Sequence, residues 1–252
     1  MNQWTRFEKS VQRHLVQVPA ETFDYSINIS LKHRYAFVET PKVCCSTIKL
    51  NLQRLETGLF DFTWPGEMDI HNRDFSPLLK PSQVHDFDKV LAAENLYTFC
   101  FVRNPYTRLL SCYLDKIVGN KPPKHAVLRI LGFSADNLDI PVSFSDFIEA
   151  ISSQHIREMN PHWRPQYYQT FQPSLSYDFI GRYESFSEDF QRVMAKIART
   201  RVPNLGVESR HRTNANGTWT KYYRPSLMER VRELFAIDFE AFGYDSSDKY
   251  DK

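Results

Sequence analysis

Three short, almost entirely apolar runs, each followed by a segment with helical spacing, constrain the fold of this chain more than any other feature. The runs are "YAFVE" at 35–39, "LYTFCFV" at 96–102 and "YDFIG" at 177–181. Strands that are apolar on both faces are typical of a parallel sheet covered by helices. The sequence therefore predicts an α/β fold with three layers, a mostly parallel sheet flanked by helices, with ligands at the carboxyl ends of the strands.

Helix-start signals stand at two of these junctions. Asn104 and Pro105 have the residue types of an N-cap and a first helical position, directly after the second run. Ser185 and Glu188 have the spacing of a capping box before the helix that follows the third run. Both signals agree with strands that lead straight into helices.

Length and charge limit the class of protein. At 252 residues and 42% hydrophobic, the chain can bury a full core, and we expect one soluble domain over 1–252. Its 32 basic and 30 acidic residues leave a net charge of +2, which gives no support to a nucleic-acid partner or a membrane surface. Any anion site must therefore be local.

The four cysteines, at 44, 45, 100 and 112, lie in or beside apolar runs without paired ligand spacing. A disulfide framework or a zinc ribbon is not expected, and a reducing compartment fits best. The N-terminus lacks the apolar core of a signal peptide, and no run of about 18 apolar residues occurs. We expect a cytoplasmic protein without a membrane segment.

A lysine and two cysteines stand in the corner between the first run and its helix, in "TPKVCCSTIK" at 40–49. A helix that starts near Cys45 leaves its first N–H groups unpaired and carries a partial positive charge, so a phosphate-like anion fits there. The hydroxyls of Ser46 and Thr47 would add donors, and Lys42 would add a full charge. An ordinary turn with a solvated lysine stays open on this stretch alone.

A second candidate anion site follows the second run, in "FVRNPYTRLLSCYLDK" at 101–116. Arg103 stands at the end of the strand, and Ser111 follows about two helical turns later. A guanidinium and a hydroxyl that meet can share one anion, although Arg103 alone also suits a cap or an ion pair. Two cationic strand ends together suggest a ligand with phosphates at two separated points.

These motifs resemble those of sulfotransferases that use 3′-phosphoadenosine 5′-phosphosulfate (PAPS), in particular the carbohydrate sulfotransferases with the HNK-1 and chondroitin enzymes. "TPKVCCSTIK" looks like their 5′-phosphosulfate loop and "FVRNPYTRLLSCYLDK" like their 3′-phosphate motif. The resemblance continues through "NPHWRPQ", "YDFIGRYESFSEDF" and "YYRPSLMERVRELFAIDFEAFGYD", and so covers about residues 35–244. It implies a P-loop-NTPase-like nucleotide-binding core.

The resemblance also implies roles for single residues. Lys42 matches the lysine that holds the bridging oxygen and the sulfuryl group. Arg103 and Ser111 match the pair that binds the 3′-phosphate. Tyr183 resembles a position near the adenosine, and Arg212 falls in the late loop that closes over the nucleotide in related enzymes. The remaining matches form the 5′-phosphate cradle, and they are Cys44, Cys45, Ser46 and Thr47.

Two departures from the family pattern stand out. The family often has glycine where this chain has Cys44, but a small side chain can be accommodated there if φ stays negative, and we expect the loop to survive. Golgi members carry a membrane anchor and two cysteines where "FQPSLSYDF" has Phe171 and Ser174. Both are missing here, which implies a cytosolic, bacterial relative.

Sulfuryl transfer needs a base for the proton of the attacking hydroxyl. His71, in "MDIHNRDFSPLL", is the first candidate, with an inert loop histidine as its alternative. His162 comes second, and Glu67 and Asp69 are weaker choices. His162 and Trp163 are also expected at the acceptor. Further aromatic residues suit either a platform for a sugar or ordinary packing, and they are Trp64, Tyr167 and Tyr168.

The sequence thus predicts a sulfotransferase that uses PAPS, releases adenosine 3′,5′-bisphosphate, needs no metal and acts on a hydroxyl, of a saccharide in particular. A kinase on a similar fold is the first rival, but the chain has no G-x-x-x-x-G-K-[ST] motif. A catalytically silent nucleotide-binding protein is the second rival. Lys42 with a histidine nearby argues against it.

Overall fold

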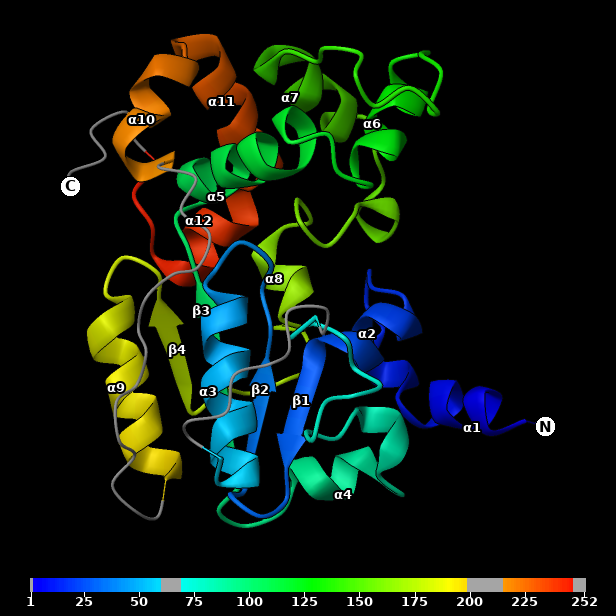
Figure 1. Cartoon of the computed structure of the whole chain (residues 1–252), viewed down its shortest axis with the longest axis vertical. Coiled ribbons are helices and arrows are strands. Elements are labelled where there is room, and N and C mark those ends of the chain that lie inside the picture. The colour runs from blue at the N-terminus through cyan, green and yellow to red at the C-terminus, as the bar shows by residue number, and fades with distance from the viewer. Residues whose placement is uncertain (1, 60–68, 199–214, 247–252) are drawn as a thin grey trace. The chain divides into compact units, whose positions relative to one another are not determined.

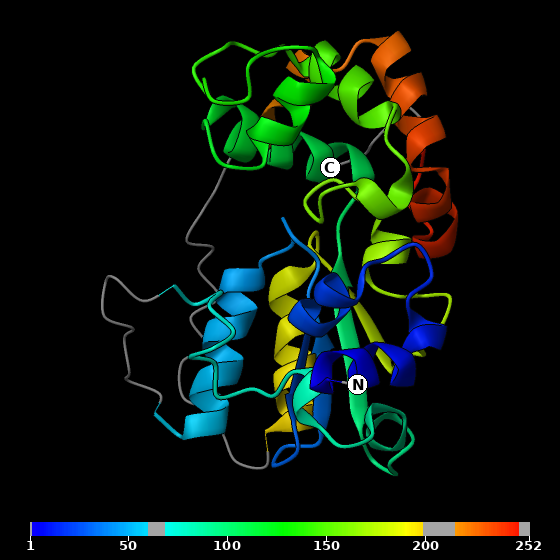
Figure 2. The same cartoon turned by 90° about the vertical axis from the view of Figure 1, so that its right-hand side faces the viewer.

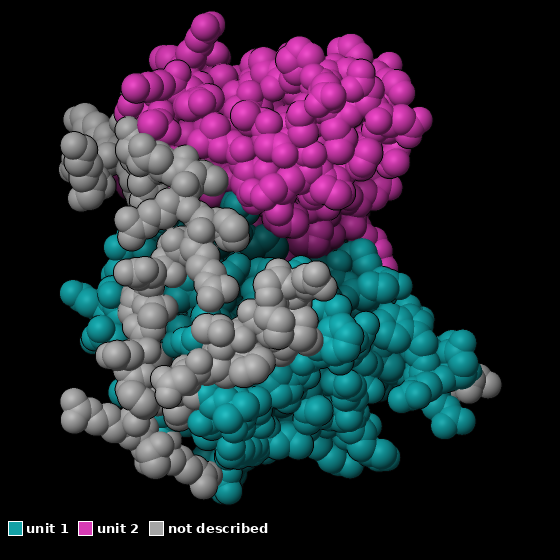
Figure 3. All heavy atoms as spheres, viewed as in Figure 1, with its two compact units in different colours: residues 1–102, 170–210 teal, residues 103–169, 211–252 magenta. Residues whose placement is uncertain are grey.

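The computed structural model describes residues 2–59, 69–198 and 215–246. The chain divides into two compact units, coloured separately in Figure 3. Unit 1 comprises residues 1–102 and 170–210, and unit 2 comprises residues 103–169 and 211–252. Compactness does not decide how many parts unfold together, so the single domain over 1–252 stays a prediction.

Unit 1 is built on a four-stranded sheet with the order β1-β2-β3-β4 (Figure 1). Its strands are β1 (Ile27–Ser30), β2 (Tyr35–Val38), β3 (Tyr97–Val102) and β4 (Phe179–Arg182). β2, β3 and β4 are parallel, which confirms the three predicted strands and the mostly parallel sheet. β1 pairs antiparallel with β2 and was not predicted, because "INIS" is short and carries two polar residues that are nevertheless buried.

Two helices of unit 1, α3 (Cys45–Thr57) and α9 (Phe186–Ile197), cover one face of the sheet in both views (Figures 1 and 2). Alternate strand residues such as Phe37, Phe99 and Phe101 point to that face and form a buried cluster with the apolar stripes of both helices. On β4, Gly181 lets the Phe101 ring approach, since a Cβ there would lie 2.3 Å from a ring atom.

The other helices of unit 1 are short, and they are α1 (Gln3–Ser10), α2 (Ala20–Ser26) and α4 (Phe87–Leu91). α2 and α4 pack through an aromatic cluster centred on Phe23, whose ring lies 5.4 Å from Phe87 and 4.8 Å from Phe171. Phe171 stands where the related Golgi enzymes are expected to have a cysteine. In this chain the position therefore contributes apolar packing.

Unit 2 is helical in the part that the structure describes. Its α-helices are α5 (Pro105–Cys112), α6 (Lys124–Ile130), α7 (Phe144–Ser152), α8 (Gln166–Gln169), α10 (Ala215–Tyr222), α11 (Pro225–Leu234) and α12 (Ala236–Phe242). α5 begins as predicted, because the Asn104 side chain accepts a hydrogen bond from the Tyr106 N–H at 2.9 Å and Pro105 is the first helical residue. The helix continues into a π-helical segment, Tyr113–Val118.

The predicted capping box at the start of α9 is wrong. Ser185 is the N-cap, but its hydroxyl makes no capping bond and donates instead to the Asp189 carboxylate at 2.7 Å. Asp189 also accepts from the Arg182 N–H at 2.9 Å. Hydrogen bonds to Asp189 that connect β4 with α9 thus replace the predicted box with Glu188.

Candidate functional site

The loop between β2 and α3 turns sharply at the carboxyl end of its strand. The Val43 N–H donates to the Thr40 carbonyl at 3.2 Å, and the Ile48 N–H donates to the Cys44 carbonyl at 3.0 Å as α3 begins. Lys42 has a φ of 73° and Cys44 a φ of 54°. The condition of a negative φ at Cys44 is not met, because this N-cap residue adopts the left-handed conformation.

The start of α3 presents the chemistry of an anion site. The first N–H groups of a helix have no partner within the helix, and its N-terminus carries a partial positive charge. Ser46 and Lys42 are half-buried beside them, and Thr47 is buried. Backbone N–H groups, hydroxyls and an ammonium are all hydrogen-bond donors, so these residues fit a phosphate or a phosphosulfate group.

Cys45 is a neutral thiol in this loop. Its Sγ donates to the Thr40 carbonyl at 2.8 Å. Burial, with a further contribution from the nearby Glu39 carboxylate, raises the pKa of the Cys45 thiol to about 12. A thiol that stays protonated at neutral pH does not repel an anion.

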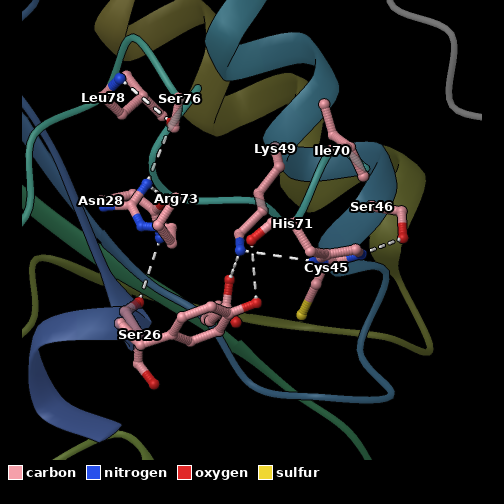
Figure 4. A network of polar contacts seen from close by, with 12 residues as sticks. Ser26, Asn28, Cys45, Ser46, Lys49, Ile70, His71, Arg73, Ser76 and Leu78 are labelled. Atoms are coloured by element: carbon pink, nitrogen blue, oxygen red, sulfur yellow. Dashed lines mark hydrogen bonds and ion pairs between the residues drawn. The ribbon is translucent and has the colours of Figure 1, made fainter. Parts of the chain in front are cut away.

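His71 lies against the first turns of α3, where Figure 4 shows it between Ser46 and Lys49. Its Nε2 is 2.8 Å from the Ser46 Oγ, and its Nδ1 is 3.5 Å from the Lys49 Nζ. The His71 N–H donates to the Asp69 carboxylate at 2.9 Å, and the Tyr25 hydroxyl donates to the His71 carbonyl at 3.2 Å. The structure therefore brings His71 to the predicted phosphate loop.

Glu39 and Lys49 form a buried ion pair beside this histidine. Their side chains are 5% and 0% exposed, and the Lys49 ammonium lies 4.9 Å from the centre of the Tyr25 ring. Burial and the Glu39 charge together hold the pKa of Tyr25 well above its usual value. Sequence reasoning missed both members of the pair, although an acidic residue directly after a buried strand was a usable signal.

Arg73 fastens the segment that carries His71 to the edge of the sheet. Its guanidinium donates to the Asn28 side chain at 2.6 Å and to the carbonyls of Ile27 and Leu79 at 2.9 Å and 3.1 Å. Leu79 in turn exchanges two backbone hydrogen bonds with Ile29 on β1. His71 is thus held by a frame that includes buried and charge-assisted bonds.

In unit 2, Arg103 is buried and is held through its backbone. The Arg103 N–H donates to the Gln166 side chain at 2.8 Å, and the Gln166 amide donates back to the Arg103 carbonyl at 2.7 Å. The N–H groups of Gln166 and Tyr167 both donate to the Asp238 carboxylate, each at 2.8 Å. Burial raises the pKa of Asp238.

A residue that the sequence reasoning missed, Thr107, stands between the predicted partners Arg103 and Ser111 in the sequence and contacts Arg103. The Arg103 Nε donates to the Thr107 hydroxyl at 3.1 Å, and Thr107 is four residues from each of the two. Residues four apart lie on one helix face, so Thr107 and the buried Ser111 follow one another along α5. The prediction that Arg103 and Lys42 grip one ligand joins residues of two units and stays a prediction.

Trp163 does not suit its predicted place at the acceptor. Its side chain is 0% exposed, packs edge-on against Phe147 at 5.7 Å and donates to the Gln154 side chain at 2.7 Å. No face of its ring is open to stack on a sugar, so packing, the alternative that the sequence left open for these aromatic residues, is what the structure shows for Trp163. His162 is half-buried, and its Nδ1 lies 2.7 Å from the Asn160 side-chain oxygen.

Tyr183, the residue predicted near the adenosine, is half-buried and packs against the core cluster. Its N–H donates to the Val102 carbonyl at 2.8 Å. Arg212, Glu67 and Trp64 lie outside the described residues. Tyr167 and Tyr168 are half-buried and meet edge to face at 5.3 Å.

Comparison with known proteins identifies relatives along most of the chain. A sequence model of the sulfotransferase family matches residues 25–245. Carbohydrate sulfotransferase 14 of Danio rerio is 27% identical over 240 residues, which cover 86% of this chain and 62% of that protein. Carbohydrate sulfotransferase 12 of Xenopus laevis is 24% identical over 276 residues, which cover 94% and 64%.

The chain spans a little over three fifths of the length of these two relatives. No solved structure matches the chain. Among residues 2–59, 69–198 and 215–246, no helix is both long enough and apolar enough to cross a membrane.

Proposed function

This chain belongs to the sulfotransferase family, and we propose that it transfers a sulfuryl group from PAPS to a hydroxyl of a saccharide. The loop from Thr40 to Cys44 carries the proposal. It places Lys42 and the N-terminus of α3 together at the carboxyl end of a parallel strand. The names of the relatives, carbohydrate sulfotransferases 12 and 14, support a saccharide acceptor.

In this proposal the residues of unit 1 hold the phosphosulfate. Lys42 lies at the bridging oxygen, and its ammonium gains interaction energy as negative charge develops there. The N–H groups at the start of α3, with the hydroxyls of Ser46 and Thr47, hold the 5′-phosphate. We place Tyr183 near the adenosine. We also include Arg212 in the proposal, as a residue of the loop that closes over the nucleotide in related enzymes.

The residues of unit 2 are proposed to read the second phosphate. The Arg103 guanidinium and the Ser111 hydroxyl would bind the 3′-phosphate, and we add Thr107 because it already contacts Arg103. We also retain His162 as a contact of the acceptor.

The transfer itself is an in-line displacement. The acceptor oxygen forms a bond to sulfur while the bond from sulfur to the 5′-phosphate oxygen breaks, and adenosine 3′,5′-bisphosphate leaves. The proton of the acceptor hydroxyl must pass to a base. His71, the base that the sequence predicts, lies beside Ser46 in the phosphate loop, and its role as base stays a prediction.

Binding of the product tests the donor. We expect adenosine 3′,5′-bisphosphate to raise the melting temperature in the presence of a chelator, because Lys42, Arg103 and the helix N-terminus supply the charge that magnesium supplies in kinases. ATP is the control ligand. Stabilisation that needs magnesium, or that is greater with ATP, would favour the kinase instead.

Turnover tests the acceptor. Labelled PAPS with a set of saccharides should yield a labelled saccharide, and release of bisphosphate should match the label transferred. Binding of the bisphosphate without transfer to any acceptor would favour the silent nucleotide-binding protein.

A further inference from the structure

The buried pair of Glu39 and Lys49 fixes the position of the hydrogen on the His71 ring. Lys49 is fully buried and its Nζ is paired with the Glu39 carboxylate, and an ammonium in such a pair has only hydrogen-bond donors to offer. The His71 Nδ1 faces that ammonium at 3.5 Å. A hydrogen on Nδ1 would set two donors against each other, so Nδ1 carries the lone pair and the neutral ring carries its hydrogen on Nε2.

The direction of the contact with Ser46 follows. Nε2 lies 2.8 Å from the Ser46 Oγ, and the Nε2–H tautomer makes the histidine the donor. A hydroxyl that accepts on one side still has its own O–H to give. Because Ser46 stands in the first turn of α3, that O–H is available to an anion at the start of the helix.

We propose that His71 is a positioning residue, which donates from Nε2 to Ser46 and so aims the Ser46 hydroxyl at the phosphosulfate group. Glu39 and Lys49 select the tautomer that makes this possible. The inference rests on the proposed function, since the anion is the donor substrate of that reaction. It also gives a function to the buried ion pair of Glu39 and Lys49, which makes no direct contact with the proposed anion in this account.

The same geometry excludes the predicted base from that position. Nε2 with a hydrogen attached cannot take a proton, and the lone pair on Nδ1 is directed at the Lys49 ammonium. The surrounding bonds suit an immobile ring, because Asp69, Tyr25 and Arg73 all hold the backbone of its segment. A base and a fixed donor make different demands on this histidine, and experiments separate them.

The tautomer is read directly from the protein without ligand. In protein with ¹⁵N-labelled histidine, the long-range ¹H–¹⁵N spectrum at mildly alkaline pH should show His71 with an unprotonated Nδ1 and a protonated Nε2. The His71→Gln variant identifies the signals by their loss. A His71 ring protonated on Nδ1 would overturn the inference whether or not any nucleotide binds.

Binding of adenosine 3′,5′-bisphosphate then tests the role of the contact by calorimetry. Ser46→Ala and His71→Ala should each lower the affinity about three- to tenfold, as expected for one neutral hydrogen bond. The double variant should be no weaker than Ser46→Ala, since both changes remove one interaction. His71→Gln, which can place an N–H near the same point, should keep most of the affinity and the turnover. The exposed His85→Ala is the matched control.

The outcomes are distinct. Wild-type protein that binds no bisphosphate overturns the proposed function, and the inference with it. If the bisphosphate binds normally to His71→Ala while turnover falls roughly 10²-fold or more, and His71→Gln is equally inactive, His71 is the general base and the inference alone is wrong. Additive losses in the double variant would also overturn it.

Discussion

The loop after β2 and the loop after β3 each follow a parallel strand and each lead into a helix, but they are held in different ways. The first contains two left-handed residues, Lys42 and Cys44, and lies beside a buried pair of opposite charges. The second is held by neutral donors, since Gln166 clasps the Arg103 backbone and Asp238 accepts from two N–H groups. The stability of a buried ion pair depends on the charge of both partners, whereas hydrogen bonds to the backbone depend on the shape and position of the side chains that make them.

The largest effect is expected when the charge pair beside the first loop is broken. Lys49→Met leaves the Glu39 carboxylate buried and without its counter-charge, so it should lower the free energy of unfolding by about 3–5 kcal/mol. Urea unfolding measures the change. The double variant Glu39→Gln with Lys49→Met should recover a large part of the loss. Equal losses in both variants would mean that packing, and not charge, is what the pair provides.

The next largest effect tests whether Lys42, in the same loop, acts in catalysis or only stabilises the fold. Lys42→Ala should lower turnover roughly 10²- to 10³-fold, because a cation at the leaving oxygen acts most strongly in the transition state. It should also weaken bisphosphate binding, since the ammonium lies near the ligand before reaction. Stability should change little, as the side chain is only half-buried. Unchanged turnover in a folded Lys42→Ala protein would remove the first loop from the mechanism.

The matching test of the second loop uses two ligands. Arg103→Ala should weaken the bisphosphate about ten- to a hundredfold, which is the usual contribution of a charged hydrogen bond, and should spare adenosine 5′-phosphosulfate, which has no 3′-phosphate. Calorimetry with both ligands gives the ratio. Equal weakening of the two would show that Arg103 supports the loop and does not read a phosphate.

The same two loops show which features of the structure could be predicted from the sequence and which could not. The strand, loop and helix from Tyr35 to Thr57 and the cap at Asn104 were predictable, because each signal lies within a few residues of its effect. The Arg103 clasp was not, since Gln166 lies 63 residues along the chain. Polar pairs of that kind have no period, so neither hydrophobic spacing nor helix signals reveal them.

The errors have the same origin. Trp163 stands beside His162 in the sequence and with it was expected at the acceptor, yet the fold buries it beside Phe147. Ser185 and Glu188 have the right spacing for a capping box, but Asp189 takes the hydroxyl because it also binds β4. In each case a contact with a neighbouring element of the fold overrode a local sequence pattern.

A smaller effect is expected from the carboxylate that holds the second loop. Asp238→Asn keeps the shape but turns one acceptor oxygen into an N–H₂ group that faces a backbone N–H, of Gln166 or of Tyr167. One buried donor then lacks an acceptor, and the free energy of unfolding should fall by about 1–3 kcal/mol. The loss should be smaller than that of Lys49→Met when both are measured by urea unfolding. The reverse order would mean that the hydrogen bonds from the backbone to Asp238, and not the pair of Glu39 and Lys49, are the more sensitive support.

The smallest effect concerns the backbone of the first loop. At a φ of 54°, Cys44 has a conformation that is strained by about 1–2 kcal/mol for a residue with a Cβ, and glycine adopts it freely. Glycine also gives the unfolded chain more freedom, by roughly 0.5–1 kcal/mol, which offsets part of the gain. Cys44→Gly should therefore raise the free energy of unfolding by at most about 1.5 kcal/mol. It should leave bisphosphate affinity unchanged, because the N–H groups of the loop stay in place. Cys44→Ala, which keeps the strain and removes the thiol, is the control. If Ala and Gly behave alike, the thiol and not the backbone determines the effect, and the left-handed turn adds no strain to this loop.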